Sequence, residues 1–167
     1  METKIRYAHA EHWCVLQLSG DIRHPVSSVV EAIIDEFLQA GDASEVLIDL
    51  TGAAFIDSTN LGLLAKVARD SWRRGQDPPI LVSTNPDINA VLESMGFSSA
   101  FHIVSEHEAS ALELHDVPTP DDYSDPRKAQ RILEAHEALI ELDEKNRQTF
   151  QSVVDVLRRN NAPDGPP

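Results

Sequence analysis

Apolar and polar positions alternate in short blocks along the first 115 residues, and these blocks predict strands and helices in turn. Apolar residues recur every three or four positions over 26–39, 59–73 and 86–95, as on one face of an amphipathic helix. The segment 45–50 is almost continuously apolar, which is typical of a strand buried on both faces. The shorter elements that we expect are strands at 4–7, 12–18, 79–82 and 102–105 and a last helix at 106–114.

This order of elements, ββαβαβαβα, predicts an α/β fold with a mostly parallel sheet flanked by helices and joined by right-handed crossovers. Residues 1–115 are enough for one such core. The full length of 167 residues therefore fits one domain with an appended segment better than two complete domains.

The appended segment divides into three parts. Residues 116–126 contain three prolines and four aspartates, so we interpret them as a linker. Residues 127–160 contain neither glycine nor proline and are rich in helix formers, which predicts a C-terminal α-helical extension. Residues 161–167 are expected to be a disordered end.

The helical extension allows two interpretations. Taken as one helix, it has a heptad pattern of apolar residues, or heptad seam, that could form the interface of a homodimer. The polar centre, 143–148, could instead separate two helices that fold back on the core, and Ile140, Phe150 and Leu157 widen the apolar stripe in favour of such packing. The seam residues are Ile132, Leu139, Asn146 and Val153 at position a, and Ala135, Leu142, Thr149 and Val156 at position d.

Charge and composition exclude several classes of function. The chain has 28 acidic and 14 basic residues and a formal net charge of −14, so nucleic acid and anionic membrane surfaces should repel it. No apolar run approaches the length of a membrane span, and residues 1–4 lack the features of a signal peptide, so we expect a cytoplasmic protein. The histidines and the single cysteine show no metal-site spacing, and no glycine-rich nucleotide loop is present, so we expect no metal and no cofactor.

The most informative segment is Asp57-Ser58-Thr59-Asn60 at the start of the second helix. These residue types cap helices, and a well-capped helix is the simplest interpretation. The free N–H groups and the positive end of the dipole also tolerate a phosphate, so a serine at this place could carry one. Gly62 lowers helix propensity in the first turns of this helix. The close approach of another backbone to this position would explain a glycine there.

Asp57-Ser58-Thr59-Asn60-Leu61-Gly62, placed after the strand 46–50, resembles the signature of STAS domains, and specifically of anti-sigma-factor antagonists. The pair Gly20-Asp21, the strand end Asp49-Leu50-Thr51 and the segment 89–97 also match, and the resemblance covers about residues 4–115. The loop 21–25, with His24-Pro25, departs from the usual alanine-rich form and leaves the identity of the partner open.

The resemblance implies a non-enzymatic phosphoswitch. The unphosphorylated protein would bind an anti-sigma factor and so free a sigma factor, a serine kinase would phosphorylate Ser58, and a metal-dependent serine phosphatase would reverse this. The kinase is often the anti-sigma factor itself. The residues that the resemblance assigns to partner binding are Asp21, Asp57, Ser58, Thr59, Asn60 and Gly62.

Two other functions remain open at this stage. A constitutive STAS scaffold or transporter subunit would use the same face without phosphorylation. A hydrolase with Ser58 as its nucleophile would need a Ser-His-Asp arrangement, for which the sequence has no local signature.

Overall fold

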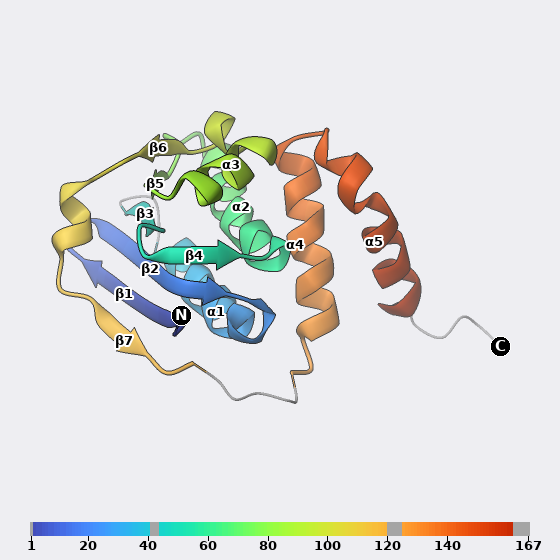
Figure 1. The fold of residues 1–167 in the computed structure, drawn as a ribbon, viewed down its shortest axis with the longest axis horizontal. Helices are drawn as coiled ribbons and strands as arrows, with labels where there is room; N and C mark the ends of the chain where they lie inside the picture. Colours follow the sequence, from blue (N-terminus) through green and yellow to red (C-terminus); the bar gives the residue numbers. More distant parts are fainter. Residues whose placement is uncertain (1, 41–43, 120–124, 162–167) are drawn as a thin grey trace.

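The computed structural model describes residues 2–40, 44–119 and 125–161 (Figure 1). Among them, seven strands form one sheet in the order β6-β5-β3-β2-β1-β7, with β4 paired to β2 off this path. The strands are β1 (Lys4–Ala10), β2 (Trp13–Ile22), β3 (Glu45–Asp49), β4 (Ala53–Ile56), β5 (Ile80–Val82), β6 (His102–Val104) and β7 (His115–Val117). Parallel pairs join β2 to β3 and β4, β3 to β5, and β5 to β6, whereas β1 is antiparallel to β2 and β7. The predicted mostly parallel sheet is confirmed.

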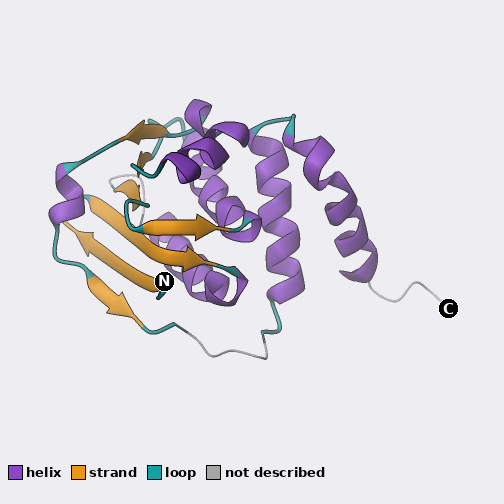
Figure 2. Cartoon of the chain, in the orientation of Figure 1, coloured by secondary structure: helices purple, strands orange, loops and turns teal. Residues whose placement is uncertain are grey.

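Helices cover this sheet and extend beyond it (Figure 2). The α-helices are α1 (Ser27–Gln39), α2 (Ser58–Arg73), α3 (Pro86–Ser94), α4 (Lys128–Leu142) and α5 (Asn146–Asn161). Three short 3₁₀ turns are η1 (His24–Val26), η2 (Phe97–Ser99) and η3 (Glu108–Ala111). In Figure 1, α4 lies beside α2, and α5 lies on the far side of α4 from the sheet.

Successive residues of β2 supply both faces of the sheet, because strand side chains alternate. Leu16 and Leu18 belong to the main apolar core, which also includes residues of α1, α2, α4 and α5. Trp13 and Val15 belong to a smaller cluster on the other face, which contains Ala109 of η3. The two helices after residue 126 are thus part of the main core, and a buried layer joins them to the domain.

Three expectations from the sequence were wrong. The strand β4 was missed, because its four residues lie in what we interpreted as a loop before α2. The helix expected at 106–114 is only the 3₁₀ turn η3. The edge strand β7 was also missed, and it crosses the boundary predicted after residue 115. Since β7 pairs only with β1 in the described chain, the aspartate- and proline-rich composition after it does not interrupt a central strand.

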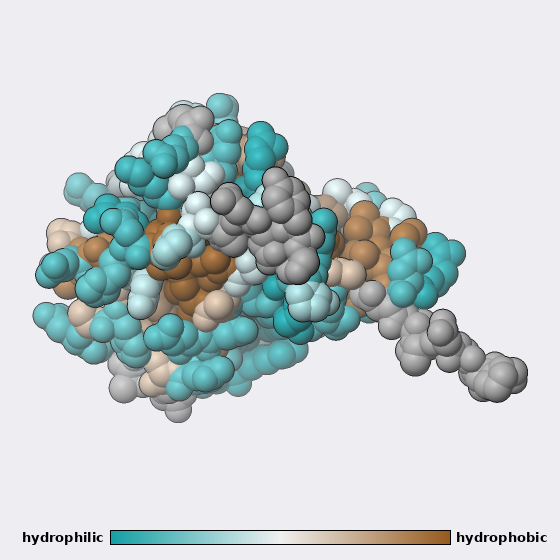
Figure 3. Space-filling model, turned by 90° about the horizontal axis from the view of Figure 1, so that it is seen from below, coloured by the Kyte–Doolittle hydropathy of each residue, from teal (hydrophilic) through white to brown (hydrophobic). Residues whose placement is uncertain are grey.

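The helical extension is a pair of helices rather than one long helix. Asp143 has extended backbone angles, φ −151° and ψ 122°, and ends α4. Of the heptad seam, Ala135 and Leu139 are buried within the chain, whereas Val153 and Val156 of α5 are exposed. Figure 3 shows apolar surface at this end of the molecule. The homodimer through 127–160 stays a prediction, as do the exact domain bounds, and residues 120–124 and 162–167 lie outside the described residues.

Candidate functional site

The candidate site is the start of α2, which directly follows the carboxyl end of β4. The Asp57 N–H donates to the carbonyl of Ile22 at 3.0 Å, which ties this junction to the end of β2. Asp57 is the N-cap of α2, and its Oδ1 accepts hydrogen bonds from the N–H and the Nδ2 of Asn60, both at 2.9 Å. The capping role expected for these two residues is therefore present. Asn60 is fully buried, and its Oδ1 accepts no hydrogen bond from the described residues.

Ser58 is the first residue of α2, and its hydroxyl is engaged by a histidine from the extension. Its Oγ lies 2.9 Å from Nε2 of His136 in α4. Nδ1 of His136 lies 2.6 Å from the carbonyl of Ile132 and must donate to it, because a carbonyl only accepts. In the neutral ring Nε2 is then the acceptor, so the Ser58 hydroxyl donates. The ring of His136 also packs edge-on against Phe150 of α5, with 5.0 Å between the ring centroids.

Gly62 lies directly beneath the backbone of α4. A Cβ placed on Gly62 would lie 2.7 Å from the Cα of Ala135 and closer still to its carbonyl group. Real Cβ atoms essentially never approach backbone so closely. The close backbone approach expected at Gly62 is confirmed, and the backbone comes from the same chain.

An ion-pair network fixes α4 against α1. Arg131 of α4 is 3% exposed and donates from Nε to Oε1 of Glu31 at 3.0 Å. Arg131 also pairs with Asp125, and Arg127 makes a second contact with Glu31 at 3.1 Å. Burial by itself would raise the pKa of Glu31, but the hydrogen bonds from Arg127 and Arg131 outweigh it and lower the pKa below its ordinary value. Glu31 is thus held as a carboxylate inside the fold.

The remaining predicted residue, Asp21, lies in β2 beside this junction. It is half-buried and pairs in register with Phe55 of β4. Phe55 is 40% exposed, and the guanidinium of Arg23 lies 4.2 Å from the centroid of its ring. Burial, and next the charge of Lys128 in α4, lower the pKa of His24, so the unusual loop 21–25 lies near the start of the extension.

The structure thus gathers the six predicted residues at one end of α2, but it exposes them unequally. Asp21, Asp57 and Ser58 are half-buried. Thr59, Asn60 and Gly62 are buried. Sequence reasoning missed the residues of α4 that meet them, Ala135 and His136, because the spacing of an amphipathic helix shows its apolar side and not which surface covers it.

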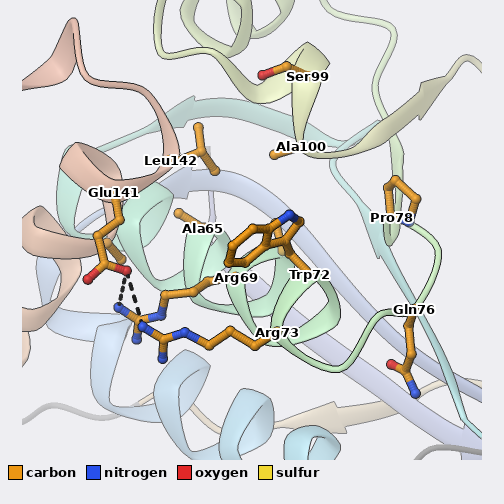
Figure 4. Close-up of a pocket in the computed structure, with 12 residues that line it drawn as sticks. Ala65, Arg69, Trp72, Arg73, Gln76, Pro78, Ser99, Ala100, Glu141 and Leu142 are labelled. Atoms are coloured by element: carbon orange, nitrogen blue, oxygen red, sulfur yellow. Dashed lines mark hydrogen bonds and ion pairs between the residues drawn. The ribbon is translucent and has the colours of Figure 1, made fainter.

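A pocket of about 460 Å³ lies at the other end of the α2–α4 contact (Figure 4). Trp72 stands over it and is 82% exposed, and Glu141 pairs there with Arg69 at 3.2 Å and Arg73 at 3.5 Å. None of the six predicted residues lines it. Within the described residues, no cluster of three histidine, cysteine, aspartate or glutamate side chains could hold a metal ion. No helix in those same parts of the chain has the length and apolar character needed to cross a bilayer.

Comparisons with known proteins match the part of the chain before α4. The sequence model of the STAS domain matches residues 4–111. An anti-sigma F factor antagonist of Paenibacillus polymyxa is 24% identical over 112 residues, which are 67% of this chain and 94% of that protein.

Two solved structures share the fold. The anti-sigma factor antagonist SpoIIAA in its unphosphorylated form matches with a TM-score of 0.52 and 19% identity, over 64% of this chain and 93% of its own. A candidate anti-sigma factor antagonist of Thermotoga maritima matches with a TM-score of 0.53 and 21% identity, over 63% of this chain and 88% of its own. These matches leave about a third of this chain without a counterpart.

Proposed function

We propose, from the premise that the chain belongs to the STAS domain family, that it is an anti-sigma-factor antagonist. With a free Ser58 hydroxyl it binds an anti-sigma factor and so releases a sigma factor. Phosphorylation of Ser58 ends that binding. The protein itself is not an enzyme, and its action on a sigma factor implies a cytoplasmic location.

One observation carries the proposal: Ser58 is the half-buried first residue of α2, behind the N-cap Asp57. A phosphate on this residue would lie at the positive end of the helix dipole, which tolerates a dianion without loss of the fold. The same dianion beside Asp57 would repel an acidic partner or disrupt a desolvated contact. The similarity to anti-sigma factor antagonists supports this use of the serine.

Two enzymes act on this chain in the proposed cycle. A serine kinase, which is often the anti-sigma factor itself in this class of proteins, transfers phosphate to Ser58. A metal-dependent serine phosphatase removes it. No nucleic acid or membrane takes part.

Affinity capture from a lysate of the source organism tests the proposal, with wild type, Ser58→Ala and Ser58→Asp in parallel. We expect wild type and Ser58→Ala to retain a kinase-like or anti-sigma protein that Ser58→Asp loses. Capture of the same proteins by all three would contradict the phosphoswitch.

A second function, that of a constitutive STAS scaffold or transporter subunit, is favoured by one observation. Thr59, Asn60 and Gly62 are buried, and Gly62 lies against the backbone of α4, so a part of the expected docking face is already in contact within the chain. In the capture experiment this function predicts scaffold or transporter subunits bound equally by all three variants.

A further inference from the structure

The extension occupies the same surface that the proposed partner requires. Gly62 cannot be reached by another protein while the backbone of Ala135 lies against it. The Ser58 hydroxyl is likewise bonded to His136. Because the match to the STAS family ends at residue 111, the element that covers this surface lies outside the matched part of the chain.

The chemistry of the covered surface is specific. Small residues, Gly62 and Ala65, lie on the side of α2 that faces α4, and basic side chains lie along the same side. Against these, α4 brings carboxylates: Glu134 pairs with Lys66 at 3.4 Å and Glu141 with Arg69 at 3.2 Å. An occupant of this surface therefore needs a small residue opposite Gly62 and acidic groups beside it. In a chain of net charge −14, a basic strip of this kind is a local exception that suits an acidic partner.

The contact between α2 and α4 combines apolar packing, through residues such as Leu139, with a polar part. The polar part is the Ser58–His136 hydrogen bond, the Lys66–Glu134 ion pair and the Arg69–Glu141 ion pair. Contacts between separable units within a chain are typically more polar than permanent ones.

From this geometry we propose that the α4–α5 pair is an intramolecular competitor of the partner. In the closed form, which is the structure described above, α4 covers the start of α2. In the open form α4 leaves α2, and an acidic surface of the partner takes its place against Gly62, Lys66 and Arg69. The same opening frees the Ser58 hydroxyl for a kinase. This inference rests on the proposed function for the nature of the partner, but not for the separation of the helices.

The competition sets the affinity of the protein. When only a fraction of molecules is open, the apparent dissociation constant rises by the inverse of that fraction. An open fraction of about 1% would thus weaken binding roughly a hundredfold relative to a permanently open protein. Any change that loosens α4 without touching α2 should therefore tighten binding.

The first test measures separation in the full chain by native-state hydrogen exchange at increasing denaturant. We expect the α4 amides to exchange through an opening that leaves β2 and β3 protected. Arg131→Glu, which places a third carboxylate beside Glu31 and Asp125, should speed α4 exchange at least tenfold. The double variant Glu31→Arg/Arg131→Glu should reverse only part of that change. It restores opposite charges at positions 31 and 131, but Arg127 and Lys66 then face a like charge at position 31.

Two further variants complete this test. Arg159→Glu makes the same charge change on α5, at an exposed side chain, and should leave α4 exchange unchanged. His136→Ala removes the bond to Ser58 and should also speed α4 exchange. This variant replaces Arg131→Glu in the test if Arg131→Glu fails to fold. If α4 and β3 exchange in one common transition in wild type and in every folded variant, the helices do not separate and the inference is wrong.

The second test uses the purified anti-sigma factor identified by the capture experiment. We expect Arg131→Glu to bind it at least tenfold more tightly than wild type and Arg159→Glu do. Binding to wild type should remove protection from α4. Equal affinities with α4 still protected in the complex would overturn the competition while leaving the proposed function intact. If no partner depends on Ser58, the proposed function fails, and the exchange test still decides whether α4 separates.

Discussion

The two sides of α2 differ in what they bury. One side carries Leu64 and Val67, which are completely buried in the main core. The other carries Ser58, Gly62 and Lys66, which meet α4 through a hydrogen bond, a backbone contact and an ion pair. At 100° per residue these two sets fall on opposite sides of the helix. One helix thus joins a contact made by apolar packing to a contact made by shape and charge, and the two should respond differently to mutation.

The largest expected effect comes from breaking the apolar side. Leu64→Ala should lower the free energy of unfolding by about 2–5 kcal/mol, because it removes buried methyl groups and leaves a cavity. The whole chain should be destabilised together, and urea unfolding followed by circular dichroism measures this. Trp72→Ala, on the same helix but 82% exposed, is the control and should change stability by less than about 0.5 kcal/mol. Similar losses in both variants would contradict the division of α2 into two sides.

An intermediate effect is expected from adding a side chain at Gly62. Gly62→Ala adds a Cβ where the backbone of Ala135 lies, and overpacking of this kind costs about 1–3 kcal/mol. Up to about 1 kcal/mol of this loss is offset, since alanine favours a helix more than glycine does. Hydrogen exchange should show the loss in α4 and α5 and not in β3. Loss of protection throughout the sheet would show that the two sides are not independent.

The smallest effect is expected from acid. Burial would raise the folded-state pKa of Glu31, but the hydrogen bonds from Arg127 and Arg131 outweigh it and lower this pKa. Burial likewise opposes ionisation of Glu134, and the interactions with Gln130 and Lys66 outweigh it, so the pKa of Glu134 is lowered as well. A lowered folded-state pKa means that the stability from these carboxylates is complete above their unfolded pKa, near 4.5, and is lost as pH falls through the folded values.

A pH titration followed by two-dimensional NMR measures this loss. The cross-peaks of α4 and α5 should lose their native positions at a higher pH than those of β2 and β3. Asp35 in α1 has its pKa raised by burial, so protonation of Asp35 acts in the opposite direction and reduces the net effect. A single transition for all cross-peaks would show that the charge pairs do not hold α4 separately.

The sequence predicted most of the domain because local patterns determine it. The apolar run 45–50 became β3, and Asp57 became the N-cap of α2 as its residue type favours. The strand β4 has only four residues, and its pairing with β2 depends on partners more than 30 positions away. Local periodicity carries no information about such a pairing.

The candidate site was predictable in position but not in its surroundings. Gly62 pointed to a close approach without naming the element, and His136 had no motif around it. The bond from Ser58 to His136 spans 78 positions. Only the docking of α4 in one register brings these two residues together, and docking of that kind is decided by tertiary packing.

Because α4 follows α2 in the sequence, the start of α2 is synthesised before the helix that covers it. All the elements from β1 to α2, which form the surface that α4 covers, are translated before α4 (Lys128–Leu142). Ribosomes add about 5–20 residues per second, so the domain emerges seconds before the helix that covers it. During that interval a nascent chain presents the start of α2 uncovered, and a partner that is abundant near the ribosome meets no competitor. Newly made and mature molecules would then differ in availability, although their sequence is the same.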